Sequence, residues 1–196
     1  MFTMLRNAFV SLLLLTLVTG VIYPLAVTAV AQGLFAHTAN GSVMERDGKA
    51  LGSDLIGQAF TDPKYFWSRP SATTPFANNP AASGASNLGP NNPALADVVK
   101  QRVAALRAAD PGNTVAVPVD LVTASASGLD PHISPAAAQY QVHRVAEIRG
   151  ISEEKINALI ANATEGRQLG ILGEPRVNVL RLNFALDQTG SSATAR

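Results

Sequence analysis

AFVSLLLLTLVTGVIYPLAVTAVAQGLFA, residues 8–36, is a run without one charged side chain. A hydrocarbon core about 30 Å thick needs roughly 20 apolar residues of helix, so the run is long enough to span a bilayer with some tilt. Its serine and threonine hydroxyls can donate to carbonyls of their own helix and therefore add little cost in lipid. We predict a single N-terminal transmembrane α-helix over residues 1–36, with the rest of the chain on one side of the membrane.

Pro24 interrupts this predicted helix. A proline removes one backbone donor and crowds the carbonyl four residues earlier, that of Gly20, so a kink is expected. A carbonyl without a partner is costly in lipid, which favours a neighbouring helix close to this point.

Charges beside the apolar run predict its orientation. Arg6 and the amino terminus lie next to one end, and Arg46 and Lys49 follow the other end at a greater distance. The positive-inside rule then favours a cytoplasmic N-terminus and a domain outside the cell membrane. The alternative is a signal peptide cleaved after Ala31, although a signal peptide has an apolar core of only about 7–15 residues. Cleavage would release a free exported binding protein or hydrolase.

Composition excludes several classes of protein. The chain has 196 residues, a formal charge of +1 and no cysteine. Near-neutral charge argues against a nucleic-acid binder, which usually carries a clustered basic face. The absence of cysteine excludes disulfides, thiolate catalysis and cysteine-ligated zinc.

Capping residues predict three helices after the membrane segment. Asn92 and Pro93 begin one that ends near Ala109, and Ser134 begins a second that ends at Gly150. Ser152 caps a third, whose first turn is acidic.

Other patterns predict a hairpin and two strands. Asp47-Gly48 is a two-residue turn signal within residues 42–51. Residues 115–119 are expected to form an edge strand, because Pro118 cannot donate to a sheet. Residues 177–186 alternate in hydrophobicity and predict a longer strand. Together these elements predict an α+β soluble domain over residues 37–187 and a disordered tail over 188–196.

Two further segments stand out. Residues 65–67, YFW, are the densest aromatic cluster and favour a place in the core or at a membrane interface. Residues 68–94 are rich in proline and asparagine with Arg69 as their single charge, which is typical of a linker. Because neither flank is large enough to make two domains, we expect an ordered loop over the domain surface, against a partner.

Catalytic and ligand-binding motifs are largely missing. The sequence has no phosphate-binding glycine loop, no G-x-S-x-G and no H-E-x-x-H. The serines, Asp130 and His132 of residues 125–134 lie too close together in sequence for a hydrolase triad, and turn formation accounts for them. The acidic helix after Gly150 argues against DNA binding. We therefore predict no catalytic, cofactor-binding or metal-binding residues.

Several segments, in order along the chain, resemble the C subunit of the bacterial Kdp potassium-transporting P-type ATPase. They follow the apolar span and read YFWSRPSA (65–72), SGASNLGPNNPAL (83–95), LVTASASGLDPHIS (121–134) and GEPRVNVLRLN (173–183). Ser68 and Ala85 stand where we expect glycine in the family pattern, which affects only local turn geometry.

The resemblance implies a complex that pumps potassium inward at the expense of ATP, with a potassium-channel-like subunit and a P-type catalytic subunit as partners. It implies a non-catalytic protein of the cell inner membrane that assists assembly and, as a catalytic chaperone, raises the pump's affinity for ATP. We expect no cofactor bound to the chain itself, with ATP acting through the catalytic subunit. The residues expected to contact the partner subunits are Gly20, Tyr23, Pro24, Arg69, Pro70, Asp130 and His132.

Overall fold

The computed structural model describes residues 1–46 and 48–191. The chain forms two compact units, Met1–Leu51 and Gly52–Arg196.

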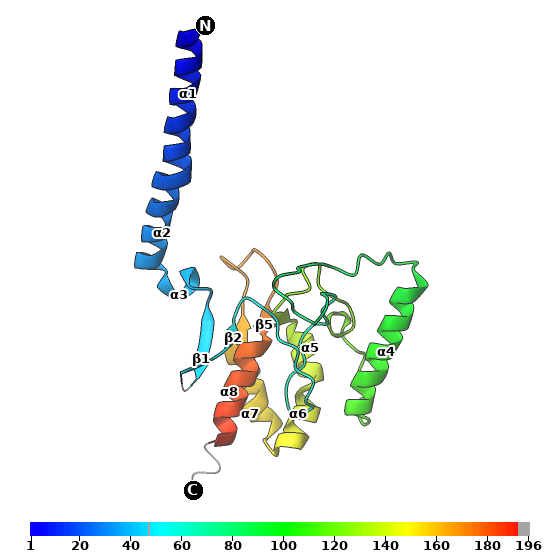
Figure 1. Ribbon diagram of the computed structural model, residues 1–196. Helices are drawn as coiled ribbons and strands as arrows, with labels where there is room; N and C mark the ends of the chain where they lie inside the picture. Colours follow the sequence, from blue (N-terminus) through cyan, green and yellow to red (C-terminus); the bar gives the residue numbers. More distant parts are fainter. Residues whose placement is uncertain (47, 192–196) are drawn as a thin grey trace. The chain divides into compact units, whose positions relative to one another are not determined.

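An apolar helix dominates the first unit (Figure 1). It consists of α1 (Phe2–Leu17), a π-helical turn (Val18–Ile22) and α2 (Tyr23–Leu34), with no side chain buried by the chain itself. The continuous helix of 33 residues, Phe2–Leu34, is long and apolar enough to cross a membrane, which confirms the predicted element.

The π-helical turn lies directly before Pro24. The N–H of Tyr23 donates to the carbonyl of Val18, five residues earlier, instead of the usual four. This wider turn accommodates a residue that has no N–H of its own. Close by, the hydroxyl of Thr19 donates to the carbonyl of Leu15 at 2.7 Å, as the sequence predicts for hydroxyls in a membrane helix.

A short helix, α3 (Ala36–Ala39), and a hairpin follow the apolar helix. The hairpin pairs β1 (Val43–Arg46) with β2 (Lys49–Ser53), as predicted. Gly48 has a φ of +72°, the left-handed conformation that a tight hairpin turn requires. Asp47, the other predicted turn residue, lies outside the described residues.

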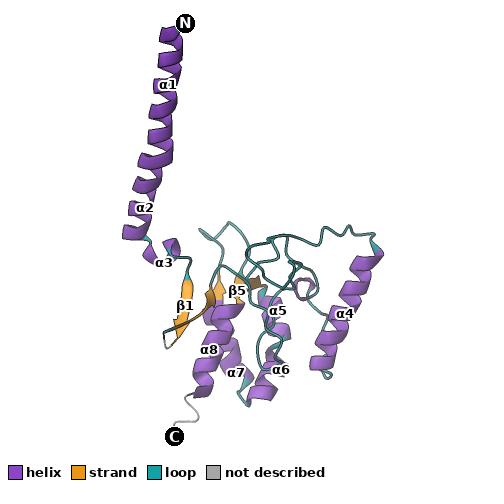
Figure 2. Ribbon diagram, viewed as in Figure 1, coloured by secondary structure: helices purple, strands orange, loops and turns teal. Residues whose placement is uncertain are grey.

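The second unit has helices and a small antiparallel sheet, which confirms the predicted α+β class (Figure 2). Its helices are α4 (Pro93–Ala109), α5 (Pro135–Tyr140), α6 (Val142–Arg149), α7 (Glu153–Ala163) and α8 (Val179–Ser191), with a 3-10 turn at Val119–Leu121. Its strands are β3 (His132–Ile133), β4 (Thr164–Glu165) and β5 (Arg176–Asn178), in the order β3-β5-β4. Helices α6, α7 and α8 lie side by side, and α7 packs against both α6 and α8.

The core of the second unit lies between these helices and the sheet. Its most completely buried large side chains are Phe66, Ile133, Ile156, Leu182 and Leu186. Phe66 is fully buried, so the aromatic cluster at 65–67 belongs to the core at this residue. Two polar side chains, Gln141 and Asn183, are buried with it.

The predicted strand over 177–186 is wrong. Only residues up to Asn178 are extended, and α8 begins at Val179. The side chain of Asn178 accepts from the N–H of Arg181 at 3.1 Å and so caps the new helix. Burial at Val179, Leu182 and Leu186 follows helical spacing, which the alternation of leucines had masked.

Two other element assignments need correction. Residues 115–119 form no strand, because Val119 belongs to a 3-10 turn in which the carbonyl of Pro118 accepts the N–H of Leu121. The predicted helix over 135–150 is two helices, broken at Gln141, whose N–H donates only three residues back, to Ala138. Its predicted end is confirmed, since Gly150 is left-handed at a φ of +61°.

Helix α8 continues through Ser191, into the predicted tail over 188–196. Its buried anchor Leu186 lies one turn before residue 190, so the helix runs past the packed segment. Residues 192–196 lie outside the described residues.

The caps of α4 and α7 are confirmed. Asn92 accepts from the N–H of Ala94 at 3.0 Å, and Ser152 accepts from that of Lys155 at 3.5 Å.

Residues 68–91 have no helix or strand, yet the hydroxyls of Ser71 and Thr73 accept from the N–H groups of Asn78 and Asn79. The segment is therefore an ordered loop, as predicted.

Candidate functional site

Three of the predicted contact residues converge in the second unit. Arg69 Nη1 lies 3.3 Å from Asp130 Oδ2, and Arg69 Nε donates to the carbonyl of Thr123 at 3.2 Å. Asp130 Oδ1 accepts from the N–H of His132 at 3.0 Å and lies 3.4 Å from His132 Nδ1. Asp130 therefore joins the ordered loop, through Arg69, to the first strand of the sheet.

The other predicted contact residues lie elsewhere. Pro70 follows Arg69 but lines a separate, apolar cavity together with Trp67. Gly20, Tyr23 and Pro24 belong to the apolar helix of the first unit, in and directly after its π-helical turn. Within the second unit, Arg69, Asp130 and His132 therefore share one cluster, and Pro70 lines a different cavity.

Turn formation positions Asp130 and His132, as the sequence predicts. Ser125 Oγ accepts from the N–H of Gly128 at 2.8 Å, and Ser127 Oγ accepts from that of Leu129 at 3.1 Å. Ser134 Oγ accepts from the N–H of Ala137 at 3.0 Å and caps α5. Each of these serine oxygens stabilises local backbone, which confirms the predicted turns and the predicted cap of the following helix.

The contacts of His132 extend the cluster across the sheet. His132 Nε2 lies 3.9 Å from Glu165 Oε2, on the far strand of the sheet. Glu165 pairs with Arg176 at 2.9 Å and with Arg181 at 3.2 Å. Arg181 Nη2 then pairs with Asp54 Oδ2 at 2.6 Å. We call this series, listed in order, the polar chain: Arg69, Asp130, His132, Glu165, Arg176, Arg181 and Asp54.

The register of the sheet explains why the polar chain forms. Glu165 on β4 lies directly opposite Arg176 on β5, and opposite charges across an antiparallel pair attract. His132 on β3 lies on the other side of β5, opposite Asn178. The sequence analysis missed Glu165, Arg176 and Arg181, because their separation along the chain hides the register. Arg176 and Arg181 both lie in the 173–183 segment that carries the family resemblance.

Electrostatics favour a charged Asp130. Its partial burial acts to raise the pKa of its carboxyl group, but hydrogen bonds from the side chain and backbone of His132 and from Arg69 outweigh burial. The net pKa of Asp130 is lower than usual, so the group stays ionised at neutral pH. A cavity of about 480 Å³ lies beside it, lined also by Arg69, His132 and Arg176.

The cluster has the chemistry of a recognition surface. It presents both acidic and basic side chains to one cavity, and such a surface suits a protein partner with complementary charges. Among residues 1–46 and 48–191, no group of three or more histidine, aspartate or glutamate side chains is placed to hold a metal ion.

A second feature, missed by the sequence analysis, is an exposed apolar loop at Gln168–Leu172, which we call the apolar tip. Leu169 is 88% exposed, Ile171 75% and Leu172 54%. Reciprocal backbone hydrogen bonds of 2.9 Å join Gln168 and Leu172, and Arg167 pairs with Glu174 at 2.7 Å below them. These contacts close the base of the loop, and its apolar side chains are exposed and not packed in the core of the second unit.

Comparison with known proteins decides the family. The family model described as "KdpC: K+-transporting ATPase, c chain" matches residues 5–188. The chain belongs to the KdpC family.

Curated relatives agree with this assignment and confirm the resemblance seen in the sequence. The potassium-transporting ATPase KdpC subunit of Polaromonas naphthalenivorans is 66% identical over 183 residues, 93% of each chain. That of Methylococcus capsulatus is 63% identical over 182 residues, 93% of this chain and 96% of the relative. That of Sorangium cellulosum is 62% identical over 183 residues, 93% of this chain and 96% of the relative.

The KdpC match includes both units of the chain. It contains the apolar helix from residue 5 onward, the polar chain from Asp54 to Arg181 and the apolar tip. A long apolar helix in a member of a membrane-transporter family identifies this chain as a membrane protein.

Proposed function

We propose that this chain is the accessory, non-catalytic subunit of an ATP-driven potassium uptake pump, which assists assembly and raises the affinity of the P-type catalytic subunit for ATP. The observation that carries the proposal is the KdpC match over residues 5–188, with relatives named as subunits of a potassium-transporting ATPase. It supports this function over a free exported binding protein or hydrolase.

The contacts in the polar chain support a role without catalysis. Asp130 is engaged by Arg69 and by the backbone of His132, and Glu165 is engaged by two arginines. The serine oxygens beside them accept backbone hydrogen bonds. A nucleophile needs a base within hydrogen-bond reach and a group that orients the base, and these side chains serve instead to fix the loop and the sheet.

We propose two kinds of contact with the potassium-channel-like and P-type catalytic subunits. Within the membrane, the helix has no side chain buried by its own chain, and Gly20, Tyr23 and Pro24 mark the π-helical turn where a neighbouring helix would pack. In the second unit, the apolar tip and the polar chain offer apolar and polar contacts, respectively, to a partner subunit.

We place the N-terminus in the cytoplasm and the second unit outside, on the basis of Arg6 beside the start of the helix. Because ATP is cytoplasmic, an external unit cannot contact it directly. Its effect on ATP affinity would then pass through the membrane helix, as a coupling free energy between two distant sites.

Cysteine labelling tests the orientation, since the natural chain has no cysteine. Lys100→Cys places a thiol on α4, where the lysine side chain is 79% exposed, and Thr3→Cys places one at the start of α1. A membrane-impermeant maleimide added to right-side-out spheroplasts should label only the Lys100→Cys variant. The reverse pattern would overturn the proposed orientation.

Reconstitution tests the effect on ATP. Pump assembled with this chain should show a lower KM for ATP than pump lacking it, at unchanged kcat. The full chain alone should show no saturable ATP binding tighter than about 1 mM, equivalent to about −4 kcal/mol. An unchanged KM in the presence of the chain would refute the role in ATP affinity, and micromolar binding to the chain alone would refute indirect action.

A further inference from the structure

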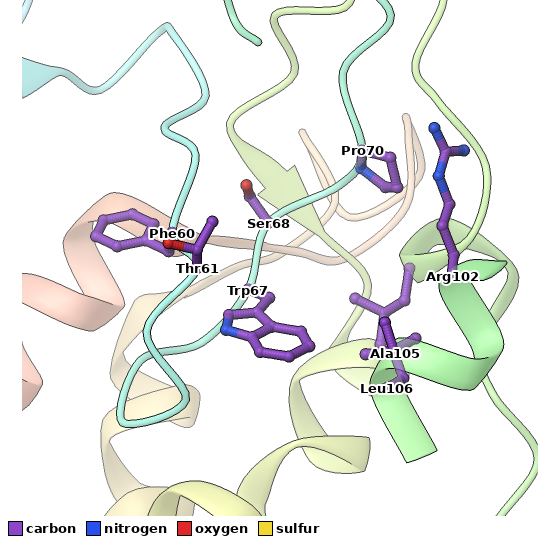
Figure 3. Close-up of a pocket in the computed structure, with 9 residues that line it drawn as sticks. Phe60, Thr61, Trp67, Ser68, Pro70, Arg102, Ala105 and Leu106 are labelled. Atoms are coloured by element: carbon purple, nitrogen blue, oxygen red, sulfur yellow. The ribbon is translucent and has the colours of Figure 1, made fainter. Parts of the chain in front are cut away.

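An apolar cavity of about 290 Å³ lies between the segment that contains Trp67 and helix α4 (Figure 3). Phe60, Trp67 and Pro70 line it from that segment, and Leu106 and Arg102 line it from α4. It is separate from the polar chain. The proposed function makes no use of it.

The indole of Trp67 is a fixed wall of this cavity. The side chain of Gln141 accepts from the backbone N–H of Trp67 at 2.8 Å and donates to its carbonyl at 3.2 Å. The indole N–H donates to the carbonyl of Asp62 at 3.2 Å, and the guanidinium of Arg144 lies 4.5 Å from the ring centre. Because the indole is already held in one orientation, little further side-chain entropy is lost when a flat apolar group packs against it.

Arg102 is the one charged side chain among the residues that line the cavity. Its Nη1 donates to the carbonyl of Val122 at 2.8 Å, which leaves other N–H groups of the guanidinium for a second acceptor. In the described part of the chain, no carboxylate lies within ion-pair distance of Arg102. Burial lowers the pKa of this guanidinium, and an anion beside it would offset that cost.

Two uncharged hydroxyl side chains also line the cavity, those of the exposed Thr61 and of Ser68. Ser68 Oγ donates to the carbonyl of Gln58 at 2.6 Å, so its hydrogen is not available to a ligand. The cavity therefore combines apolar walls with one positively charged donor. That combination fixes a ligand with an apolar body and an anionic end.

We propose that this cavity binds a small organic carboxylic acid, with an aromatic or branched body against Trp67 and Leu106 and its carboxylate on Arg102. A planar guanidinium matches the two oxygens of a carboxylate, and the charge strengthens the hydrogen bonds. A neutral molecule with the same carbon skeleton fills the same space but leaves Arg102 without an anion.

Trp67 is the single tryptophan in the sequence, so its fluorescence reports directly on the cavity. The full chain, in micelles of an uncharged detergent, is titrated with 3-phenylpropionate and separately with 3-phenylpropanol. We expect saturable quenching by both, with the acid binding about tenfold tighter than the alcohol, because a charge-assisted hydrogen bond is stronger than a neutral one. Equal affinity for the two compounds would overturn the proposal.

Three variants locate the binding. Arg102→Gln should remove the tenfold preference for the acid, whereas Lys100→Gln, on an exposed face of α4, should retain it. Ala105→Phe should abolish saturable binding of both compounds, because Ala105 is exposed and lines the cavity, so a larger side chain there fills it. Retention of the acid preference in Arg102→Gln, or of binding in Ala105→Phe, would also overturn the proposal.

Discussion

The side-chain amide of Asn183 pairs with both backbone groups of Phe66. Asn183 Oδ1 accepts from the N–H of Phe66 at 2.9 Å, and Asn183 Nδ2 donates to its carbonyl at 2.9 Å. Asn183 is 2% exposed and Phe66 is fully buried. The side chain of Asn183, on α8, therefore satisfies both backbone groups of a buried loop residue, as a neighbouring strand would in a sheet. This pairing fixes the aromatic cluster in the core.

Asn183→Leu should destabilise the second unit by about 2–4 kcal/mol, because two buried backbone groups lose their partner at roughly 1–3 kcal/mol each. Urea unfolding of the full chain, followed by Trp67 fluorescence, measures the change. Asn162→Leu, on an exposed face of α7, is the matched control and should change stability by less than about 0.5 kcal/mol. Equal stability of the two variants would contradict the importance of the Asn183–Phe66 pair.

The same pair explains where the sequence analysis failed. Leucines at 180, 182 and 186 alternate as in a strand, and burial of Asn183 is not expected from hydropathy. Only the tertiary contact with Phe66 requires a polar residue there, and the helix begins because Asn178 caps it. Local signals with a strong physical basis, such as the caps of α4 and α7 and the apolar run of residues 8–36, were predicted correctly.

The residues of the candidate site were likewise predicted only in part. Arg69, Asp130 and His132 were predicted as contact residues, and they do come together. Glu165, which lies near His132, and Arg181, which pairs with Glu165, were missed, because strand pairing between β3, β4 and β5 brings together residues that are far apart in sequence. The apolar tip was missed because no local sequence pattern indicates that Leu169, Ile171 and Leu172 are exposed and not part of the core.

Arg144 is a buried cation held by oxygen atoms. Its guanidinium donates to the carbonyls of Pro63 and Tyr65 and, at 2.7 Å, to Gln141 Oε1. Burial lowers its pKa to about 10. Arg144→Met keeps much of the side-chain volume but loses these donors, so stability should fall by about 1.5–3 kcal/mol in urea unfolding.

The exposed Arg107→Met on α4 is the control for that measurement. It should leave the midpoint of unfolding almost unchanged. If Arg144→Met were equally neutral, the hydrogen bonds of Arg144 would not contribute to stability.

His143 makes the stability of the second unit depend on pH. A hydrogen bond and the charge of Asp110, whose side chain is 5% exposed, raise the pKa of His143, and Glu147 and Glu153 act in the same direction. Since the pKa is raised in the folded state, this stabilisation is complete below the ordinary value of about 6.5 and is lost as pH rises through the folded pKa. The Tm should therefore fall more between pH 6 and pH 8.5 in the natural chain than in His143→Gln.

Comparison with His143→Gln removes the contribution of the other histidines, which both chains share. Parallel falls in Tm would show that the pair of His143 with Asp110 does not stabilise the fold.

The apolar tip should matter for assembly and not for folding. Leu169→Ser with Ile171→Ser removes two side chains that are 88% and 75% exposed, so unfolding should change little. Recovery of the chain with a tagged partner subunit of the pump should fall severalfold, because apolar surface is lost from the contact. Val115→Ser, at a 63% exposed position in another loop, is the control. Unchanged recovery of the double variant would exclude the tip from the interface.

The last prediction separates positioning from catalysis at Asp130. Asp130→Asn keeps an oxygen that can accept from the N–H of His132 but removes the negative charge beside Arg69. In the proposed accessory role, pump assembled with Asp130→Asn or His132→Ala should keep its kcat for ATP hydrolysis, and only complex yield or the KM for ATP should change. Asp97→Asn, at a 68% exposed position on α4, should change neither. An intact complex with either variant but without ATP turnover would assign Asp130 or His132 to the chemistry itself and refute the non-catalytic role.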